Sequence, residues 1–199
     1  MISAKLGTHS ANATLTTDSN GEQIENPVTG DRMTILCSTN DTNGEYVKFQ
    51  FELPPGSQGS PLHYHDTKTE IFEVLSGSLE MEVGEKGNIK VLQPGEVLQI
   101  PTNVYHSFRN ASDNWVIFTS EVRAAGEFEH FLRSLFGLAI DGKVNKEGTP
   151  TNLLQFALLI KKADTIIVGP PVFLQKLAIG VLAGIARFLR VDQSLVKYK

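Results

Sequence analysis

Residues 61–70 of this chain read PLHYHDTKTE, two histidines and a glutamate around a short polar segment. His63 and His65 stand two positions apart, and side chains at i and i+2 of a β-strand project from the same face. If residues 66–69 form a tight turn, Glu70 lies on the next strand beside the two imidazoles. The stretch therefore predicts two histidines and a carboxylate that converge on one side of a sheet.

A third histidine follows further along the chain. Residues 95–110 read GEVLQIPTNVYHSFRN, in which Gly95 and Pro101 mark turns and His106 lies on a candidate strand. If the sheet curls into a barrel, His106 faces the first two histidines from across it. Three of the five histidines of the chain fall in these two segments.

Three neutral imidazoles and one carboxylate form a ligand set for a divalent first-row metal ion. The set does not select among iron, manganese, nickel, cobalt, copper and zinc. An ion with five or six ligands would keep one or two positions open for water, dioxygen or a chelating substrate. Burying these side chains unpaired would cost about 1–3 kcal/mol per group, so coordination of one ion is the simplest way to accommodate them.

Short runs of alternating apolar and polar residues surround these segments. In residues 46–53, Val47, Phe49, Phe51 and Leu53 alternate with polar side chains, which predicts a strand with one buried face. Further strands are predicted over residues 32–38, 62–65, 70–75, 79–83, 89–92, 105–109 and 115–122, and one begins near 97 after a predicted type II turn at 93–96. This spacing is typical of an antiparallel sandwich or a closed barrel.

The residues quoted above resemble the two motifs of the cupin superfamily. The first motif, HxH, three or four residues, E, six residues, G, is matched by His63, His65, Glu70 and Gly77. The second motif, G, five residues, PxG, two residues, H, three residues, N, is matched by Gly95, Pro101, His106 and Asn110. Together the two spaced motifs are far more specific than a single HxH, and the resemblance covers about residues 45–122.

Two positions depart from the cupin pattern. The glycine usually found six residues before the first histidine is displaced to Gly56, and Asn103 stands in the place of the inner glycine of the second motif. Asparagine tolerates the left-handed backbone region better than most residues. We therefore expect Asn103 to adopt a positive φ and the turn to form.

The resemblance implies a mainly β fold, the cupin double-stranded β-helix or jelly-roll barrel, with a C-terminal α-helical tail. It also implies one divalent metal ion held by His63, His65, Glu70 and His106, with a pocket around it. The whole chain resembles single-domain cupins that append such a tail. Because the superfamily includes dioxygenases, decarboxylases, isomerases, sugar-binding proteins and storage proteins, the resemblance leaves the reaction open.

The chain changes character near residue 126. Residues 1–125 hold 8 basic and 16 acidic side chains, whereas residues 126–199 hold 10 basic and 6 acidic ones. Apolar residues at helical spacing predict helices over 127–138, 152–162 and 172–190. We therefore expect a flexible N-terminal arm at 1–22, the barrel domain at 23–125, and a helical extension at 126–199 that packs on the barrel or on a dimer partner.

The last predicted helix contains an uncharged apolar run, residues 177–186, with Gly180 and Gly184 at a close-packing spacing. A membrane-spanning helix needs about 20 such residues, and Lys176 and Arg187 bound this run too closely. Packing on the barrel or on a second subunit is the favoured interpretation, and it predicts a homodimer. A helix lying on an anionic membrane surface is the alternative that the composition leaves open.

Composition narrows the choice of partners and compartment. The 199 residues carry a formal net charge of −4 and a pI near 5.7, which argues against a nucleic-acid partner because such a partner requires a basic face. The amino terminus lacks the apolar stretch of a secretory signal. The single cysteine, Cys37, is expected to be a buried free thiol. These features predict a cytoplasmic protein that binds a small molecule.

Two functional hypotheses explain these residues. The first is a mononuclear metalloenzyme of dioxygenase-like oxidoreductase type, in which Glu70 is a fourth ligand that can also swing free as a general base. A substrate with a hydroxyl-carbonyl or carboxylate group would chelate the open positions. Metal-dependent isomerisation or decarboxylation is an alternative with the same ligands. The second hypothesis is a noncatalytic cupin that binds a small ligand.

Overall fold

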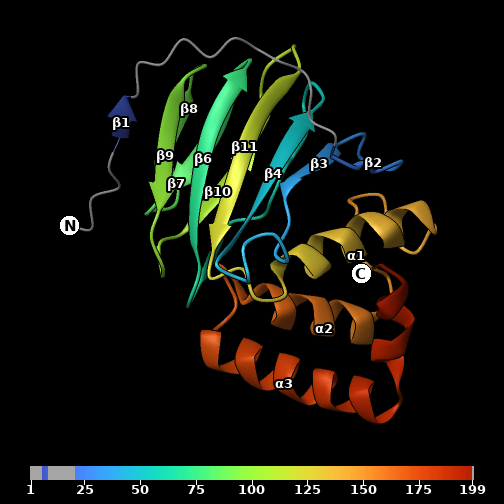
Figure 1. Ribbon diagram of the computed structural model, residues 1–199. Helices are drawn as coiled ribbons and strands as arrows, with labels where there is room; N and C mark the ends of the chain where they lie inside the picture. The colour runs from blue at the N-terminus through green and yellow to red at the C-terminus, as the bar shows by residue number, and fades with distance from the viewer. Residues whose placement is uncertain (1–5, 9–20, 199) are drawn as a thin grey trace.

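The computed structural model describes residues 6–8 and 21–198, where twelve strands form two antiparallel sheets that face one another (Figure 1). The seven-stranded sheet has the order β1 (Leu6–Thr8), β9 (Glu96–Ile100), β6 (Thr69–Ser76), β11 (Val116–Arg123), β4 (Tyr46–Leu53), β3 (Arg32–Cys37), β2 (Gln23–Glu25). The five-stranded sheet has the order β12 (Thr165–Ile167), β5 (His63–His65), β10 (His106–Arg109), β7 (Leu79–Val83), β8 (Ile89–Leu92). The predicted mainly β barrel with a helical tail is confirmed.

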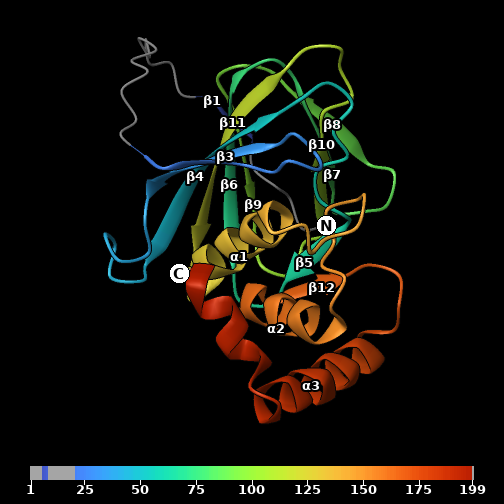
Figure 2. The same cartoon turned by 90° about the vertical axis from the view of Figure 1, so that its right-hand side faces the viewer.

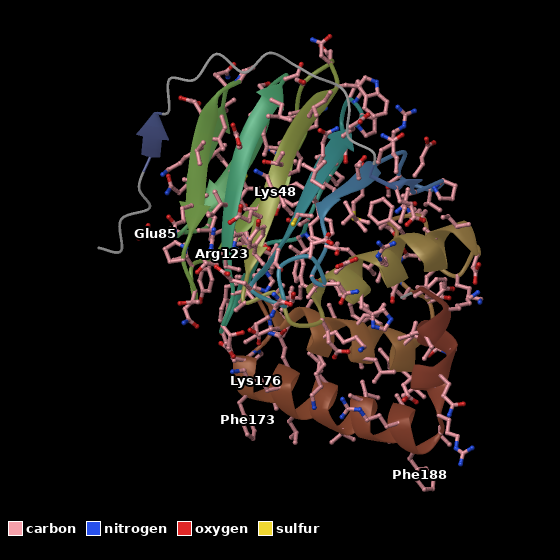
Figure 3. The ribbon with its side chains drawn as sticks, in the orientation of Figure 1. Lys48, Glu85, Arg123, Phe173, Lys176 and Phe188 are labelled. Carbon is pink, nitrogen blue, oxygen red and sulfur yellow. The ribbon has the colours of Figure 1, made fainter. Side chains whose placement is uncertain are left out.

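Alternation of apolar and polar residues fixes which way each strand faces. In β4, Val47, Phe49, Phe51 and Leu53 are buried, as predicted, and the residues between them are half-buried on the outer side. Figure 3 shows Lys48 on that outer face of the sheet. Because a shift of one residue would turn the whole apolar set toward water, the register of β4 between β3 and β11 is strongly specified.

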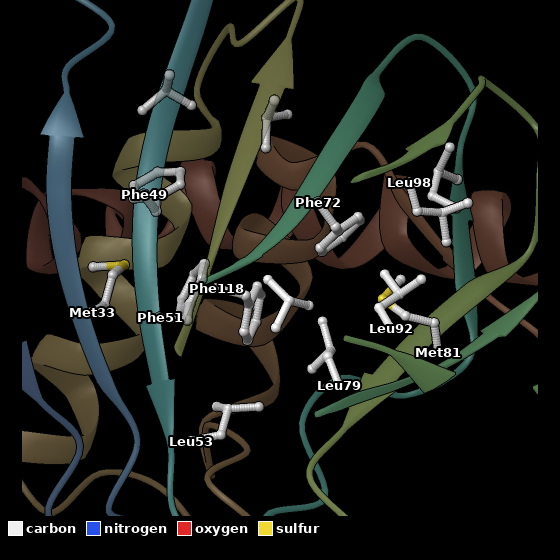
Figure 4. Close-up of a cluster of buried hydrophobic side chains, with 14 of the residues drawn as sticks. Met33, Phe49, Phe51, Leu53, Phe72, Leu79, Met81, Leu92, Leu98 and Phe118 are labelled. Carbon is white, nitrogen blue, oxygen red and sulfur yellow. The ribbon is translucent and has the colours of Figure 1, made fainter. Parts of the chain in front are cut away.

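The core of the barrel lies between the two sheets (Figure 4). Phe49, Phe72 and Phe118 from the larger sheet are fully buried, as are Leu79 and Met81 from the smaller one. Burying each of these side chains contributes on the order of 1.5–3 kcal/mol. This apolar cluster holds the sheets face to face, so the strands that carry the candidate ligands have fixed positions.

Two turns near the candidate site have the predicted backbone. Gly95 has a φ of 85°, and the Glu96 amide donates to the Gln93 carbonyl at 3.0 Å, which closes the turn before β9. Asn103 adopts a φ of 61°, so the expectation for this departure from the cupin pattern is confirmed. The Asn103 amide also donates to the His65 carbonyl at 2.8 Å. The turn therefore ties the segment before β10 to the end of β5.

Three α-helices and a final 3-10 helix are stacked against one end of the barrel (Figures 1 and 2). They are α1 (Phe128–Ile140), α2 (Leu153–Ala163), α3 (Val172–Phe188) and η1 (Val191–Tyr198). The Asn152 side chain caps α2 by accepting from the amides of Leu154 and Gln155. A second apolar cluster joins the helices to one another and consists of Leu138, Leu158, Leu159, Ala183, Ala186 and Leu195.

One strand of the helical extension belongs to the barrel. β12 lies between α2 and α3 in the sequence and pairs antiparallel with β5, with Thr165 opposite His65. The division into a barrel to residue 125 and an extension from 126 stays a prediction. Of the predicted arm at 1–22, residues 6–8 form β1 and pair with β9, residues 21 and 22 lead into β2, and the rest lies outside the described residues.

No single helix within residues 6–8 and 21–198 is long and apolar enough to cross a membrane. α3 and η1 reach that length and composition only as a pair, and they meet at a bend of 89°. The inner side of α3 packs on the other helices, while its outer side is exposed. Cys37 is a free thiol as expected, but it is half-buried rather than buried, because it ends β3 with its sulfur 3.9 Å from the Tyr46 hydroxyl.

Candidate metal centre

The four predicted ligand residues come from three strands in both sheets. His63 and His65 on β5 are buried and point inward, and Tyr64 between them lies on the other face. His106 on β10 is the direct partner of His63 across the strand pair. Glu70 belongs to β6 of the facing sheet and is 5% exposed. The structure therefore brings all four predicted residues together in the barrel interior. Their predicted placement was wrong: His106 lies beside His63 in the same sheet, and Glu70 faces them from the other sheet, because β10 rather than β6 pairs with β5.

The three imidazoles are close enough to share one ion. One ring nitrogen from each of His63, His65 and His106 lies within 4.8 Å of the others. Two nitrogens bound to the same first-row ion at about 2.1 Å lie up to about 4.2 Å apart. The observed spacing fits a shared ion after a small inward adjustment of the side chains.

Backbone carbonyls orient each imidazole. The Nδ1 atoms lie at hydrogen-bond distance from main-chain oxygens: 2.7 Å for His63 to Pro61, 3.1 Å for His65 to Asp164 and 2.9 Å for His106 to Val104. A carbonyl only accepts, so each Nδ1 carries the proton. In the neutral ring Nε2 is then an unprotonated lone-pair donor, the form that binds metal ions.

Glu70 completes the arrangement. Its Oε1 atom lies 3.3 Å from His65 Nε2 and its Oε2 atom lies 3.3 Å from His106 Nε2. The Nε2 atoms of both histidines are buried without a hydrogen-bond partner. Lone pairs of neutral imidazoles and of a carboxylate that face one another repel, so a cation among them, either a metal ion or protons, is required.

Electrostatics of the metal-free site agree with this requirement. Burial alone would raise the pKa of the Glu70 carboxyl, but contacts with His106 and His65 hold that pKa well below its usual range. Burial opposes protonation of His65 too, yet the adjacent Glu70 raises the pKa of His65 on balance. Burial lowers the pKa of His63 to about 3, with further lowering from His106 and His65. Glu70 is therefore an anion at neutral pH and His63 is neutral.

The donor chemistry fits a divalent first-row ion. Three Nε2 lone pairs and one buried carboxylate satisfy nitrogen and oxygen preferences, and the Nδ1 hydrogen bonds supply the outer contacts that orient metal-bound histidines. Glu70 lies beside the three-histidine group and contacts two of its members. This geometry makes all four residues candidate ligands.

A cavity of about 300 Å³ opens from the candidate centre toward the helices. On the barrel side its lining includes Phe51, His63, Glu70, Phe108 and Ser120. On the helical side its lining includes Phe128, Phe131, Leu135, Phe156 and Ile160. None of the described residues that line the cavity is a lysine or an arginine. Beyond the candidate centre the cavity is therefore lined mainly by apolar side chains.

An aromatic wall begins at the candidate centre and continues along α1. The Phe128 ring meets the His65 ring edge-on at 5.7 Å between centroids, and the Phe131 ring lies 5.5 Å from that of Phe128. The sequence predicted α1 from the spacing of these phenylalanines but did not assign them to a site. A helical apolar pattern shows that a face is covered, and it does not reveal whether a cavity lies against it.

Comparisons with known proteins agree with the fold and the motifs. Residues 49–120 match the family model described as cupin domain. The chain is 33% identical over 109 residues to quercetin 2,3-dioxygenase of Bacillus subtilis (strain 168), a match that covers 54% of this chain and 31% of that protein. It is 29% identical over 122 residues to oxidoreductase iacF of Pestalotiopsis fici, with 58% of each chain covered.

Among solved structures, the polyketide cyclase RemF from Streptomyces resistomycificus superposes with a TM-score of 0.46 at 22% identity, over 53% of this chain and 75% of that chain. Residues 49–120 are therefore similar to a cupin domain, and this segment includes the three strands that carry the four candidate ligands. The chain spans 31% and 58% of the lengths of the two curated relatives.

Proposed function

We propose that this chain is a mononuclear metal-dependent oxidoreductase of the dioxygenase type that acts on a small chelating molecule. The observation that carries the proposal is the convergence of three buried histidines whose Nδ1 hydrogens are already bonded to carbonyls. The similarity to quercetin 2,3-dioxygenase and to oxidoreductase iacF supports the reaction type.

His63, His65, His106 and Glu70 would hold the ion, and a bound first-row ion supplies Lewis acidity and, for redox-active metals, electron transfer toward dioxygen. Glu70 has a second role available to it. Its pKa lies well below its usual range, so it is ionised at neutral pH and its oxygens can accept a hydrogen bond from a substrate hydroxyl and assist its deprotonation. The phenylalanine wall gives the same space an apolar lining.

The cavity narrows the class of substrate. A ligand there meets the candidate centre at one end and mainly apolar side chains beyond it, and the described lining residues include no lysine or arginine that would bind a phosphate. We therefore propose a molecule with adjacent hydroxyl and carbonyl oxygens on an aromatic or aliphatic body. Isomerisation of a phosphorylated sugar is disfavoured by the same lining.

The test uses the full chain loaded separately with each candidate divalent metal. Oxygen uptake is measured with two chelators, maltol and unsubstituted flavonol, which share a hydroxyl-ketone pair and differ in their apolar bodies. We expect binding of both, tighter binding of flavonol, and oxygen consumption with at least one metal. Glu70→Gln should reduce turnover by about 10²-fold or more, while the outward-facing control on the same strand, Glu73→Gln, should not.

The outcomes separate the two functional hypotheses. Retained metal and tight flavonol binding without turnover under any metal would favour a noncatalytic ligand-binding cupin. Absence of metal binding in the wild type, or unchanged metal affinity in His65→Ala, would refute the metal site itself.

A further inference from the structure

α3 is the outermost layer of the helical stack, farthest from the barrel in both ribbon views (Figures 1 and 2). Its inner side packs on α2 and η1, where Ala183 and Ala186 are buried. The opposite side covers nothing within the described part of the chain. The proposed metal chemistry makes no use of this side.

The side that faces away from the barrel is apolar along the whole helix. We define the outer α3 face as the exposed residues Phe173, Leu174, Leu177, Val181, Ile185, Phe188 and Leu189. Their spacing of mostly three or four residues places them on one stripe. Phe173 is 73% exposed and Phe188 is 86% exposed, and Figure 3 shows both side chains pointing away from the molecule at the two ends of α3.

The charged residues of the segment that carries this stripe all have the same sign. Residues 165–191 contain no aspartate or glutamate, although the chain as a whole has a net charge of −4. The cations of this segment are Lys176, Arg187 and Arg190. Lys176 pairs with Asp66 at 2.7 Å on the surface, whereas neither arginine has an ion-pair partner among the described residues. Lys176 lies beside Phe173 in Figure 3.

We propose that the outer α3 face binds an anionic phospholipid bilayer, with the helix lying in the plane of the interface. A helix with an apolar stripe, with cations and without anions in its own sequence, has the pattern of an interfacial helix. The apolar side chains would enter the acyl boundary and the arginines would meet lipid phosphates. This inference does not depend on the proposed enzymatic function.

A second copy of the chain fits the same face less well. A 17-residue helix is about 25 Å long and about 10 Å wide, a footprint of roughly 250 Å². A stable dimer commonly buries about 800 Å² on each partner. The stripe also offers no carboxylate to the arginines of a symmetric partner. The homodimer predicted from the sequence would therefore need surface beyond this face.

The experiment measures flotation of the purified full chain with phosphatidylcholine vesicles, made with or without phosphatidylserine. We expect binding to the anionic vesicles, weakened by raising the salt concentration. Phe173→Ser with Phe188→Ser should lower the partition coefficient by about tenfold or more, since binding scales with buried apolar area. Ile89→Ser with Val91→Ser on β8 is the matched control, because both residues are exposed on the barrel.

The proposal predicts vesicle binding that the control pair retains and the phenylalanine pair loses. Circular dichroism and thermal unfolding of both pairs verify that they remain folded. Absence of binding to anionic vesicles, or equal binding by both pairs, would overturn it. A vesicle-free dimer that the phenylalanine pair abolishes would also overturn it, because a second copy would then cover the face.

Discussion

His63 links the stability of the metal-free barrel to pH. Burial, reinforced by His106 and His65, lowers its pKa from 6.5 to about 3. The unfolded chain therefore binds a proton at this residue in a range of pH where the folded chain does not. Stability must fall as the pH falls from about 6.5 toward about 3.

The size of the effect follows from the shift. Each pH unit within this window costs about 1.4 kcal/mol, so the contribution of His63 to the unfolding free energy should fall by about 2 kcal/mol between about pH 7 and pH 5. His65 acts in the opposite direction near the upper end of this window, and Glu70 acts below it. Because the pKa of His65 is raised in the folded chain, its protonation contributes stability that is fully present below about pH 6.5. That stability is lost as the pH rises through the pKa of His65 in the folded chain. Because the pKa of Glu70 is lowered in the folded chain, its ionised form contributes stability that is lost only as the pH falls below about 4.5.

The assay is urea unfolding of the chelator-treated chain at these two pH values, for the wild type and for His63→Gln. Between the two pH values, the unfolding free energy of the variant should fall by about 2 kcal/mol less than that of the wild type. His130→Gln on α1, outside the cluster, is the control for replacing a histidine by glutamine. An equal loss of unfolding free energy in the wild type and in His63→Gln would refute the conclusion that His63 is neutral in the folded chain.

Substitutions at three further positions test how the site is supported, each by chemical denaturation. Gly77→Ala should destabilise the chain by about 2 kcal/mol or more, because φ is +76° and the new Cβ would lie 2.4 Å from the Trp115 carbonyl oxygen; a neutral result would contradict this. Asn103→Val should cost about 1–2 kcal/mol and Asn103→Gly less, since only the former opposes a positive φ; equal costs would be unexpected. Asn110→Ala should cost about 2–4 kcal/mol because the buried amide donates to three main-chain carbonyls; a cost under about 1 kcal/mol would count against that role.

The strands of the barrel could be predicted because each has a local pattern. The alternation in residues 46–53 alone specifies β4 and its buried face. β2 and β12 were not predicted, since each has only three residues and forms by pairing with a longer or distant strand. Thr165–Ile167 lies between two helices and becomes a strand only because β5 presents a free edge to it.

The candidate ligands could be predicted because their geometry is nearly local. Two histidines at i and i+2 share a face in any strand, and the motif spacing indicated His106 and Glu70. Two other features depend on tertiary contacts. The carbonyl that orients His65 belongs to Asp164, which is 99 residues away along the chain, and Phe131 joins the cavity only because α1 packs across the barrel end. No local pattern contains that information.

The central claim is that one metal ion lies among four side chains from three strands. It is tested most directly by an anomalous difference map from crystals of the untagged chain, collected at the absorption edge of the metal found in the sample. A single peak is predicted about 2.0–2.3 Å from the Nε2 atoms of His63, His65 and His106 and from a Glu70 oxygen. A peak at another place, or well-ordered imidazoles with no peak among them, would contradict it.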